Sequence, residues 1–330
     1  MSELHTFLFD GQPVRGMVVR LGDAWRDMLA RREQAGAYPQ AVTELLGEMT
    51  AAAVLMQANI KFNGALVLQI MGDGPLKLAV AEVQPDLSVR ATATVVGEVP
   101  SGSLAEVGLS QLVNVHNQGR CAITLDPLDR LPGQQPYQGV VPLFDDAGQR
   151  IEQVAEVLSH YMLQSEQLDT RLVLAANQDL AAGLLIQRLP IKGEANLQGS
   201  SAALAHEDAI GRNEDYNRIA ILASSLKREE LLTLDVDTVL HRLFWEEPLT
   251  RFEPKAGDTG PHFACRCSRE RVAGMLRSLG VAEVESVVAE RGEVDVGCEF
   301  CGARYRFDAV DAAQVFTQPL ASPPVEPSAH

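Results

Sequence analysis

Four of the five cysteines form two closely spaced pairs near the C-terminal end of the chain. One pair occupies a C-x-C motif at 265–267, the other occupies a C-x-x-C motif at 298–301, and 30 residues lie between them. Two such pairs, brought together by folding, can supply four thiolates to a tetrahedral zinc ion. Gly302 follows the second pair and permits the tight turn that a C-x-x-C knuckle requires. The predicted zinc ligands are Cys265, Cys267, Cys298 and Cys301.

The spacing alone leaves three kinds of site open. The first is a static zinc ribbon that only staples a small subdomain, the second is a redox-active zinc site, and the third is an iron or disulfide-exchange site. A thioredoxin-like enzyme is disfavoured because its C-x-x-C follows a strand in a βαβ pattern, which is absent here. An all-cysteine ligand set favours the redox reading, since oxidising any pair destroys the site. Three nearby arginines, Arg266, Arg269 and Arg271, are expected to favour the thiolate form of the first pair.

Other residues that could carry chemistry give weaker signals. Cys121 lies in a strand-like segment and is interpreted as an inert buried thiol, and His262 as a bystander beside four cysteines. The GDGP segment at 72–75 lacks the GK[ST] ending of a phosphate-binding loop, so ATP binding has no support. There is neither a Gly-x-Ser-x-Gly elbow nor a metalloprotease histidine pair. We therefore expect no catalytic residues and no enzyme.

Charge and hydropathy restrict the partners and the compartment. The chain has 330 residues and a net charge of −16, which argues against binding to nucleic acid or to an anionic membrane surface. The N-terminus has no basic start followed by an apolar run, and no apolar stretch reaches the roughly 18–20 residues that span a bilayer. We expect a cytoplasmic protein, whose cysteines are thiols or metal ligands rather than stable disulfides.

The hydrophobic pattern predicts an α+β first domain over residues 1–192. Residues 17–57 have helical spacing. From about Ala53 four strands are expected in an antiparallel meander, with a type I′ hairpin at Asn63-Gly64 between the first two. Further strand-like segments are LVNVHN, CAITLD, YQGVVPL, LVLAAN and AGLLIQRLP, and a helix is expected within 149–168.

Three further parts follow the first domain. Residues 193–260 are expected to form a partly metastable linker with two amphipathic helices, the second capped by Asp235 or Thr233. Residues 261–310 are expected to form the zinc-binding domain, and 311–330 a disordered Pro-rich tail. Between the cysteine pairs a helix should begin at the N-cap Ser268 and end at Gly280. Its expected inward residues are Val272, Met275, Leu276 and Leu279.

The chain resembles the bacterial 33-kDa redox-regulated heat-shock chaperone family. The most specific part of the resemblance is CRCSRER followed by GEVDVGCEFCGARYRFD, because C-x-C paired with a distant C-x-x-C is unusual. Similar blocks along the chain are NGALVLQIMGDGPLKLAV, YQGVVPL, YMLQSEQLDTRL, GLLIQRLP, EELLTL and RLFWEE.

The resemblance implies an ATP-independent holdase for unfolding client proteins under oxidative and heat stress. It implies that the reduced, inactive protein holds one zinc ion per chain on the four cysteines. Oxidation would join them in the pairs Cys265–Cys267 and Cys298–Cys301, release zinc, unfold the linker and expose an apolar client-binding surface. The oxidised form would be a homodimer. The alternatives are a thiol-disulfide oxidoreductase that uses Cys298 and Cys301, and a static zinc-stapled interaction module.

Overall fold

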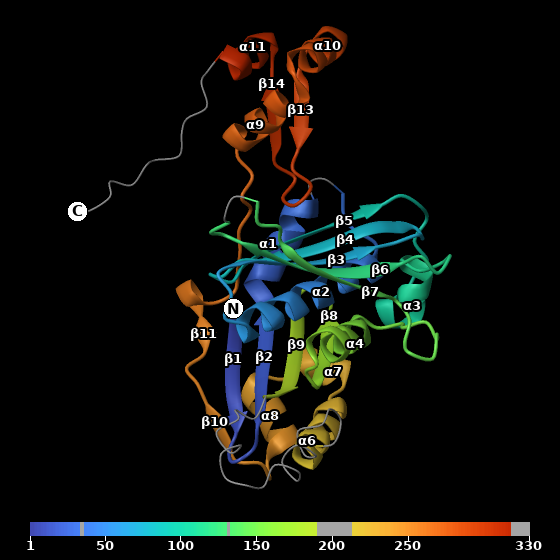
Figure 1. Ribbon diagram of the computed structural model, residues 1–330, viewed down its shortest axis with the longest axis vertical. Helices are drawn as coiled ribbons and strands as arrows, with labels where there is room; N and C mark the ends of the chain where they lie inside the picture. The colour runs from blue at the N-terminus through green and yellow to red at the C-terminus, as the bar shows by residue number, and fades with distance from the viewer. Residues whose placement is uncertain (34–35, 131–132, 190–212, 318–330) are drawn as a thin grey trace, which may run out of the picture. The chain divides into compact units, whose positions relative to one another are not determined.

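The structure is a computed structural model that describes residues 1–33, 36–130, 133–189 and 213–317 (Figure 1). It divides into two compact units, Met1–Ala264 and Cys265–His330. Within the described residues, none of the helices has the length and apolar character needed to cross a membrane.

Two sheets form the frame of the first unit. The strands of the first sheet are β1 (Ser2–Phe9), β2 (Val14–Leu21), β8 (Thr170–Ala176), β9 (Ala181–Arg188), β10 (Leu249–Arg251) and β11 (Lys255–Ala256). Its order is β10-β1-β2-β9-β8, and β11 also pairs with β1. The strands of the second sheet are β3 (Gly64–Met71), β4 (Leu76–Val83), β5 (Ser88–Val95), β6 (Arg120–Pro127), β7 (Tyr137–Pro142) and β12 (His262–Phe263). Its order is β12-β5-β4-β3-β6-β7, and only β12 runs parallel to its neighbour among these described pairings.

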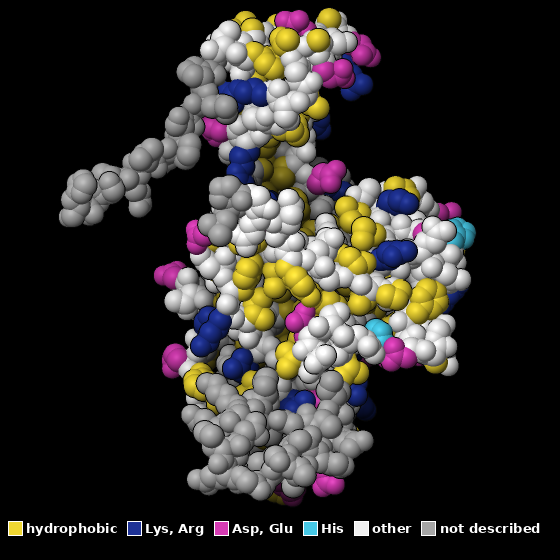
Figure 2. All heavy atoms as spheres, viewed as in Figure 1, with side chains coloured by type: hydrophobic (Ala, Val, Ile, Leu, Met, Phe, Trp, Pro, Cys, Tyr) yellow, Lys and Arg dark blue, Asp and Glu magenta, His cyan; other side chains and the backbone are white. Residues whose placement is uncertain are grey.

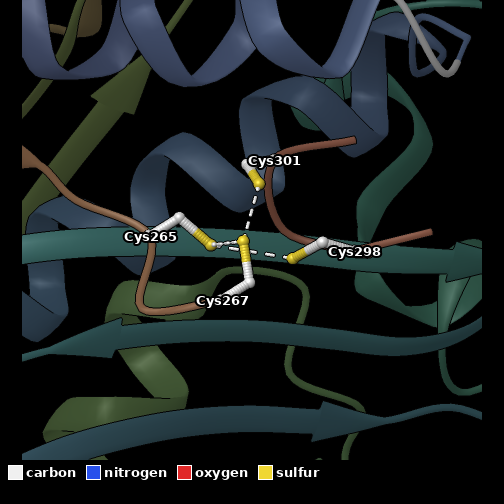
Figure 3. A group of neighbouring side chains, drawn as sticks. All are labelled: Cys265, Cys267, Cys298 and Cys301. Carbon is white, nitrogen blue, oxygen red and sulfur yellow. Dashed lines mark hydrogen bonds between the residues drawn. The ribbon is translucent and has the colours of Figure 1, made fainter. Parts of the chain in front are cut away.

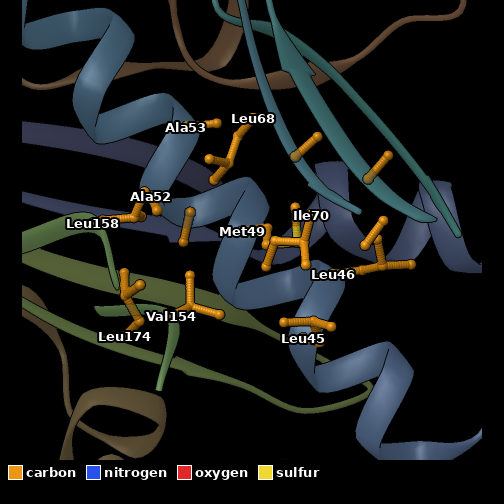
Figure 4. Close-up of a cluster of buried hydrophobic side chains, with 14 of the residues drawn as sticks. Leu45, Leu46, Met49, Ala52, Ala53, Leu68, Ile70, Val154, Leu158 and Leu174 are labelled. Atoms are coloured by element: carbon orange, nitrogen blue, oxygen red, sulfur yellow. The ribbon is translucent and has the colours of Figure 1, made fainter. Parts of the chain in front are cut away.

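Helix α2 (Gln40–Asn59) is the centre of the core of the first unit. Every residue from Ala41 to Gln57 is buried, including the carboxylates of Glu44 and Glu48, because other elements of the first unit surround the helix. Figure 4 shows α2 with side chains of β3, β8 and α4 gathered around it. The close approach of α2 to β8 depends on small residues, because a Cβ added at Gly47 would lie 2.3 Å from the Cβ of Ala176. The other helices of this half of the chain are α1 (Gly22–Glu33), α3 (Leu104–Leu112) and α4 (Val154–Glu166).

Residues 190–212 lie outside the described part of the chain, and the chain from residue 213 onward adds a layer of helices to the first sheet (Figure 1). These helices are α6 (Glu214–Ser224), α7 (Arg228–Thr233) and α8 (Val236–Phe244). The two amphipathic helices predicted here are confirmed, and Asp235 caps α8 by accepting a hydrogen bond from the backbone N–H of Thr238. Their buried faces form a second hydrophobic core with β1, β2, β8 and β9.

Several local predictions for the first unit are wrong. Residues 17–21 belong to β2, not to a helix, and β1 was not predicted. The segment ANIKF is the end of α2 followed by a loop, so the meander has three strands, β3 to β5. Asn63 and Gly64 have no positive φ and therefore do not form a type I′ turn. LVNVHN begins at the last residue of α3 and continues as a turn, so it is not a strand. The strands predicted at CAITLD, YQGVVPL, LVLAAN and AGLLIQRLP and the helix predicted within 149–168 are confirmed.

The second unit is a small three-helix module around a two-stranded hairpin. Its elements are α9 (Arg269–Leu279), α10 (Val281–Arg291), β13 (Val294–Gly297), β14 (Arg304–Phe307) and α11 (Ala309–Thr317). Its core consists of Ala273, Leu276, Val284, Val294, Phe307, Ala312 and Val315. The tail expected to be disordered from 311 is therefore helical as far as Thr317, and 318–330 lie outside the described residues.

The predicted ends of α9 are confirmed, but its predicted inward face is only partly correct. Ser268 accepts a hydrogen bond from the backbone N–H of Arg271, and Gly280 ends the helix at a φ of +94°. Leu276 is buried as expected, whereas Met275 and Leu279 are exposed. The difference arises because α10 and α11, which were not predicted, cover only one side of α9.

Candidate metal centre

Two turns of the second unit carry the four cysteines. Cys265 and Cys267 precede α9, whose first turn is fixed by the Ser268 cap. Cys298 and Cys301 lie in the loop that joins β13 to β14. In this knuckle the Gly302 backbone N–H donates to the Cys298 carbonyl over 2.8 Å, and Gly302 has a φ of +70°. The prediction that Gly302 permits the tight turn is thus confirmed.

The four sulfur atoms converge on one point. Figure 3 shows the side chains of both pairs directed toward one another. The Sγ of Cys265 lies 3.4 Å from that of Cys267 and 3.6 Å from that of Cys298. The Sγ of Cys267 lies 3.4 Å from that of Cys301, and all four lie within 4.8 Å of one another. All four are free thiols, because these separations far exceed a disulfide bond of about 2.05 Å.

The donor set fits a tetrahedral metal ion. Zinc binds thiolate at about 2.3 Å, which places the sulfurs of a regular tetrahedron roughly 3.8 Å apart. The three shortest observed separations, 3.4–3.6 Å, are slightly below that value, and all four sulfurs lie within 4.8 Å of one another. Cys301 is buried and the other three are half-buried, so solvent is only partly excluded. The four cysteines could therefore hold a metal ion, and soft sulfur ligands in this arrangement suit zinc.

The thiols are not equivalent in acidity. Burial would raise the pKa of Cys267, but a hydrogen bond from the Tyr305 hydroxyl, together with contacts to the other thiols, lowers that pKa to about 7. Burial raises the pKa of Cys265 and of Cys301. Cys267 is therefore the ligand of these three that is most readily deprotonated.

Tyr305 was missed by the sequence reasoning. It lies on β14, four residues after Cys301, where the segment RYRF alternates charged and aromatic residues. That alternation predicts a strand with Tyr305 and Phe307 on one face, next to the knuckle. It gives no indication that the phenol reaches Cys267, because this contact joins β14 to the other cysteine pair.

The prediction that arginines create the thiolate environment is not supported for Cys267. The groups that lower its pKa are Tyr305 and the other cysteines. The guanidinium of Arg269 instead pairs with Asp311 over 2.7 Å and donates to the Arg306 carbonyl over 2.8 Å. It also lies 4.3 Å from the centroid of the Phe307 ring. Arg269 thus joins α9 to β14 and α11.

The two weaker candidates lie in the first unit. Cys121 is on β6 with 1% of its side chain exposed, and burial raises its pKa to about 12. A buried thiol with a raised pKa is unreactive, which agrees with the interpretation of Cys121 as inert. His262 is on β12, and its Nδ1 lies 3.1 Å from the carbonyl oxygen of Gly260. Within the described residues, the cluster of potential metal ligands contains only the four cysteines.

Comparison with known proteins identifies similar chains over nearly the full length. A family model described as Hsp33 protein matches residues 2–308. The 33 kDa chaperonin of Chromobacterium violaceum is 45% identical over 315 residues, covering 96% of this chain and 94% of the relative. The 33 kDa chaperonin of Methylobacillus flagellatus is 42% identical over 323 residues, covering 98% and 97%. The crystal structure of a 33 kDa chaperonin (heat shock protein 33 homolog) from Thermotoga maritima superposes on this chain with a TM-score of 0.69 at 21% identity. The match covers 95% of this chain and 97% of that one, and it supports the fold.

Proposed function

Because the chain belongs to the Hsp33 family, we propose that it is a redox-regulated, ATP-independent holdase that binds unfolding proteins. The names of its relatives support a chaperone. The observation that carries the finer proposal is the convergence of the sulfurs of Cys265, Cys267, Cys298 and Cys301 within 4.8 Å. In the reduced protein these four residues would hold one zinc ion per chain.

The second unit has little to stabilise it apart from such a metal. Among the described residues, its core contains seven buried apolar side chains. Structural zinc contributes roughly 10–16 kcal/mol of apparent binding energy to small modules, whereas a whole domain is stable by only about 5–15 kcal/mol. Losing the four ligands should therefore unfold this unit.

Oxidation would remove the ligands in pairs. As Cys265 bonds to Cys267 and Cys298 to Cys301, each pair of thiolates loses two electrons. One hydrogen peroxide per pair takes up these two electrons and two protons from the solvent and is reduced to two waters. A disulfide sulfur no longer offers the thiolate that zinc requires. The chemical event is thus confined to the second unit.

The client-binding surface is proposed to lie under α6 to α8. Phe7 and Phe9 on β1 are completely or almost completely buried, and both pack against Phe244 of α8 with ring centroids 6.2 and 5.0 Å away. Undocking the helices would expose this aromatic cluster together with the helices' own apolar faces. Hydrophobic side chains are already visible on one face of the first unit (Figure 2). The exposed surfaces could hold clients or join two chains in a homodimer.

The connection between the cysteines and these helices runs through the chain itself. Strands β10 and β11 pair with β1, and β12 pairs with β5 immediately before Cys265. Residues 213–264 are therefore attached at one end to the module that oxidation would unfold. We propose that loosening this end weakens short pairings first, since β11 and β12 contain two residues each.

Two arginines, Arg228 and Arg20, make the polar contacts that hold helix α7 in place. Arg228 of α7 pairs with the buried carboxylates of Glu44 over 2.9 Å and Glu48 over 2.8 Å. Arg20 of β2 donates hydrogen bonds of 2.7 Å to the carbonyl oxygens of Leu231 and Leu234 at the end of α7. These contacts would have to break for the layer to undock.

The deciding experiment measures zinc release beside suppression of client aggregation, before and after peroxide at raised temperature. We expect one zinc per reduced chain with only sulfur in the first shell, and coincident zinc loss and client protection after oxidation. Cys121→Ser should leave the zinc content unchanged. Nitrogen ligands, or zinc loss without client protection, would contradict the proposal and leave a static zinc module. Turnover of a disulfide substrate would instead indicate an oxidoreductase. We place the protein in the cytoplasm, where its thiols stay reduced until stress.

A further inference from the structure

The first unit contains a cavity that the proposed switch does not use. Its volume is about 320 Å³, and it lies beside the C-terminal end of α2, between side chains of the two sheets. Its walls are mainly apolar and come from α2, α4 and strands of both sheets. Representative wall residues are Met56, Leu66, Ile123, Met162, Leu172 and Leu185.

One cation lies at this cavity. Arg15 of β2 is the only Lys or Arg among its described lining residues. Within the described part of the chain, Arg15 pairs with no carboxylate at ion-pair distance. Its Nη1 donates to Asn59 Oδ1 over 2.9 Å, and no described residue accepts a hydrogen bond from its Nε or Nη2. A cation held by neutral groups beside an apolar cavity favours an anionic ligand group.

The position of Arg15 is fixed by a chain of neutral hydrogen bonds. The Asn59 side-chain amide that accepts from Arg15 donates in turn to the Gln187 side chain. Gln187, 3% exposed, donates to the hydroxyl of Thr170 over 2.9 Å. This relay orients the guanidinium before a ligand arrives, which reduces the entropy that binding would cost.

Glu166, the only acidic residue among the described lining residues, is poorly placed to neutralise Arg15. Its Oε1 accepts hydrogen bonds from the hydroxyls of Tyr161 over 2.8 Å and Tyr137 over 3.3 Å. The Glu166 side chain is exposed, so its repulsion of an anion is screened by solvent.

We propose that this cavity binds one single-chain amphiphile that ends in a carboxylate, with the chain among the apolar walls and the carboxylate on Arg15. The size of the cavity limits the chain length. A cavity of about 150 Å³ accommodates benzene, so twice that volume accommodates about a dozen non-hydrogen atoms. Decanoate has that size and is the probe we would use.

The test uses the full-length, reduced, zinc-loaded chain with ¹³C-labelled methionine methyl groups. Decanoate, below its micelle concentration, should shift the Met56 and Met162 signals saturably, with one site per chain by calorimetry. The exposed Met71 and Met275 should not move, because they lie outside the cavity lining. Decanol and decylamine, which lack the carboxylate, should bind at least about tenfold more weakly.

Two arginine variants locate the anion-binding group. Arg15→Gln should weaken decanoate binding at least about tenfold and leave decanol binding unchanged. The matched control is Arg120→Gln, because Arg120 is exposed on β6 and does not line the cavity. Equal binding of decanoate and decanol, equal shifts at all methionines, or unchanged decanoate affinity in Arg15→Gln overturns the proposal. If Arg15→Gln fails to fold, the methionine shifts and the three ligands decide the question on the unaltered chain.

Discussion

The hydroxyl group of Tyr305 donates a hydrogen bond to the Sγ of Cys267 over 3.1 Å. This contact joins β14, which follows the second cysteine pair, to the first pair. It also lowers the pKa of Cys267 against the opposing effect of burial. Tyr305 thus favours the thiolate at the ligand whose pKa is about 7.

Replacing Tyr305 by Phe should weaken zinc retention roughly threefold to tenfold, because a half-exposed hydrogen bond to a thiolate is lost. Competition with a chromogenic chelator measures the change. Zinc binding requires deprotonated thiols, so retention should fall with falling pH and should fall most steeply below about 7, where Cys267 also becomes protonated. Without the phenol the pKa of Cys267 rises, and the fall should move to higher pH. Tyr137→Phe, in the first unit, is the control, and identical pH profiles for Tyr305→Phe and the unaltered protein would refute this role.

The order of oxidation should follow ring geometry rather than distance. Short sulfur contacts occur within the first pair and across the two pairs, at 3.4–3.6 Å, so proximity does not select one bond. A C-x-x-C pair closes a less strained ring than C-x-C, whose Cβ atoms are harder to orient. We expect Cys298–Cys301 to form first and Cys265–Cys267 second. Peptide mapping during a peroxide time course checks this, and a dominant Cys267–Cys301 bridge is the contrary result.

The metal site could be predicted from the sequence because its ligands are local pairs. Each pair is fixed by residues next to it, such as Ser268 and Gly302, whose predicted roles are confirmed. The contact between Tyr305 and Cys267 could not be predicted, because it depends on how β14 packs beside a turn 38 residues earlier.

Strand β2 shows why part of the fold was misread. Most of its residues are buried, because α2 covers one face of the first sheet and α6 to α8 cover the other. A strand that is buried on both faces loses the alternation that identifies strands. The end of α2 was misread for a related reason. Asn63-Gly64 is a strong turn signal, but tertiary burial extends the helix to Asn59, and Gln57 donates to the Gly64 carbonyl over 3.1 Å.

The buried carboxylate of Glu48 should make the stability of the first unit depend on pH. Burial raises its pKa to about 7, with Arg228 opposing the shift and Glu44 adding to it. The folded pKa of Glu48 lies above its unfolded value of 4.5, so folding favours the protonated side chain. The stability that this protonation contributes is fully present below about pH 4.5 and is lost as the pH rises through 7. Between pH 5 and 8 the unaltered protein should lose on the order of 1–3 kcal/mol more unfolding free energy than Glu48→Gln.

Urea unfolding followed by the fluorescence of the buried Trp25 measures this difference. Glu229→Gln is the control, because Glu229 is an exposed carboxylate on α7. Parallel pH profiles for Glu48→Gln and the unaltered protein would show that Glu48 does not titrate in this range.

Undocking α8 without oxidation should activate the protein. Phe244 is 2% exposed and packs against Phe7 and Phe9, so a carboxylate there would be buried without a partner, at a cost of several kcal/mol. We expect Phe244→Asp to release the helical layer, expose β1 and suppress client aggregation in the reduced, zinc-bound state. A chain that ends near residue 195 should do the same, because it lacks α6 to α8 altogether.

Light scattering of a heat-unfolded client, zinc content and hydrogen exchange together test this. Exchange in Phe244→Asp should rise across 213–264 while β3 to β5 stay protected. The neighbouring Trp245 is 69% exposed, so Trp245→Asp should leave both exchange and activity unchanged. If Phe244→Asp raises exchange in 213–264 and retains zinc, yet clients still aggregate, the surface under α6 to α8 does not bind clients. The holdase activity would then have to come from another part of the chain.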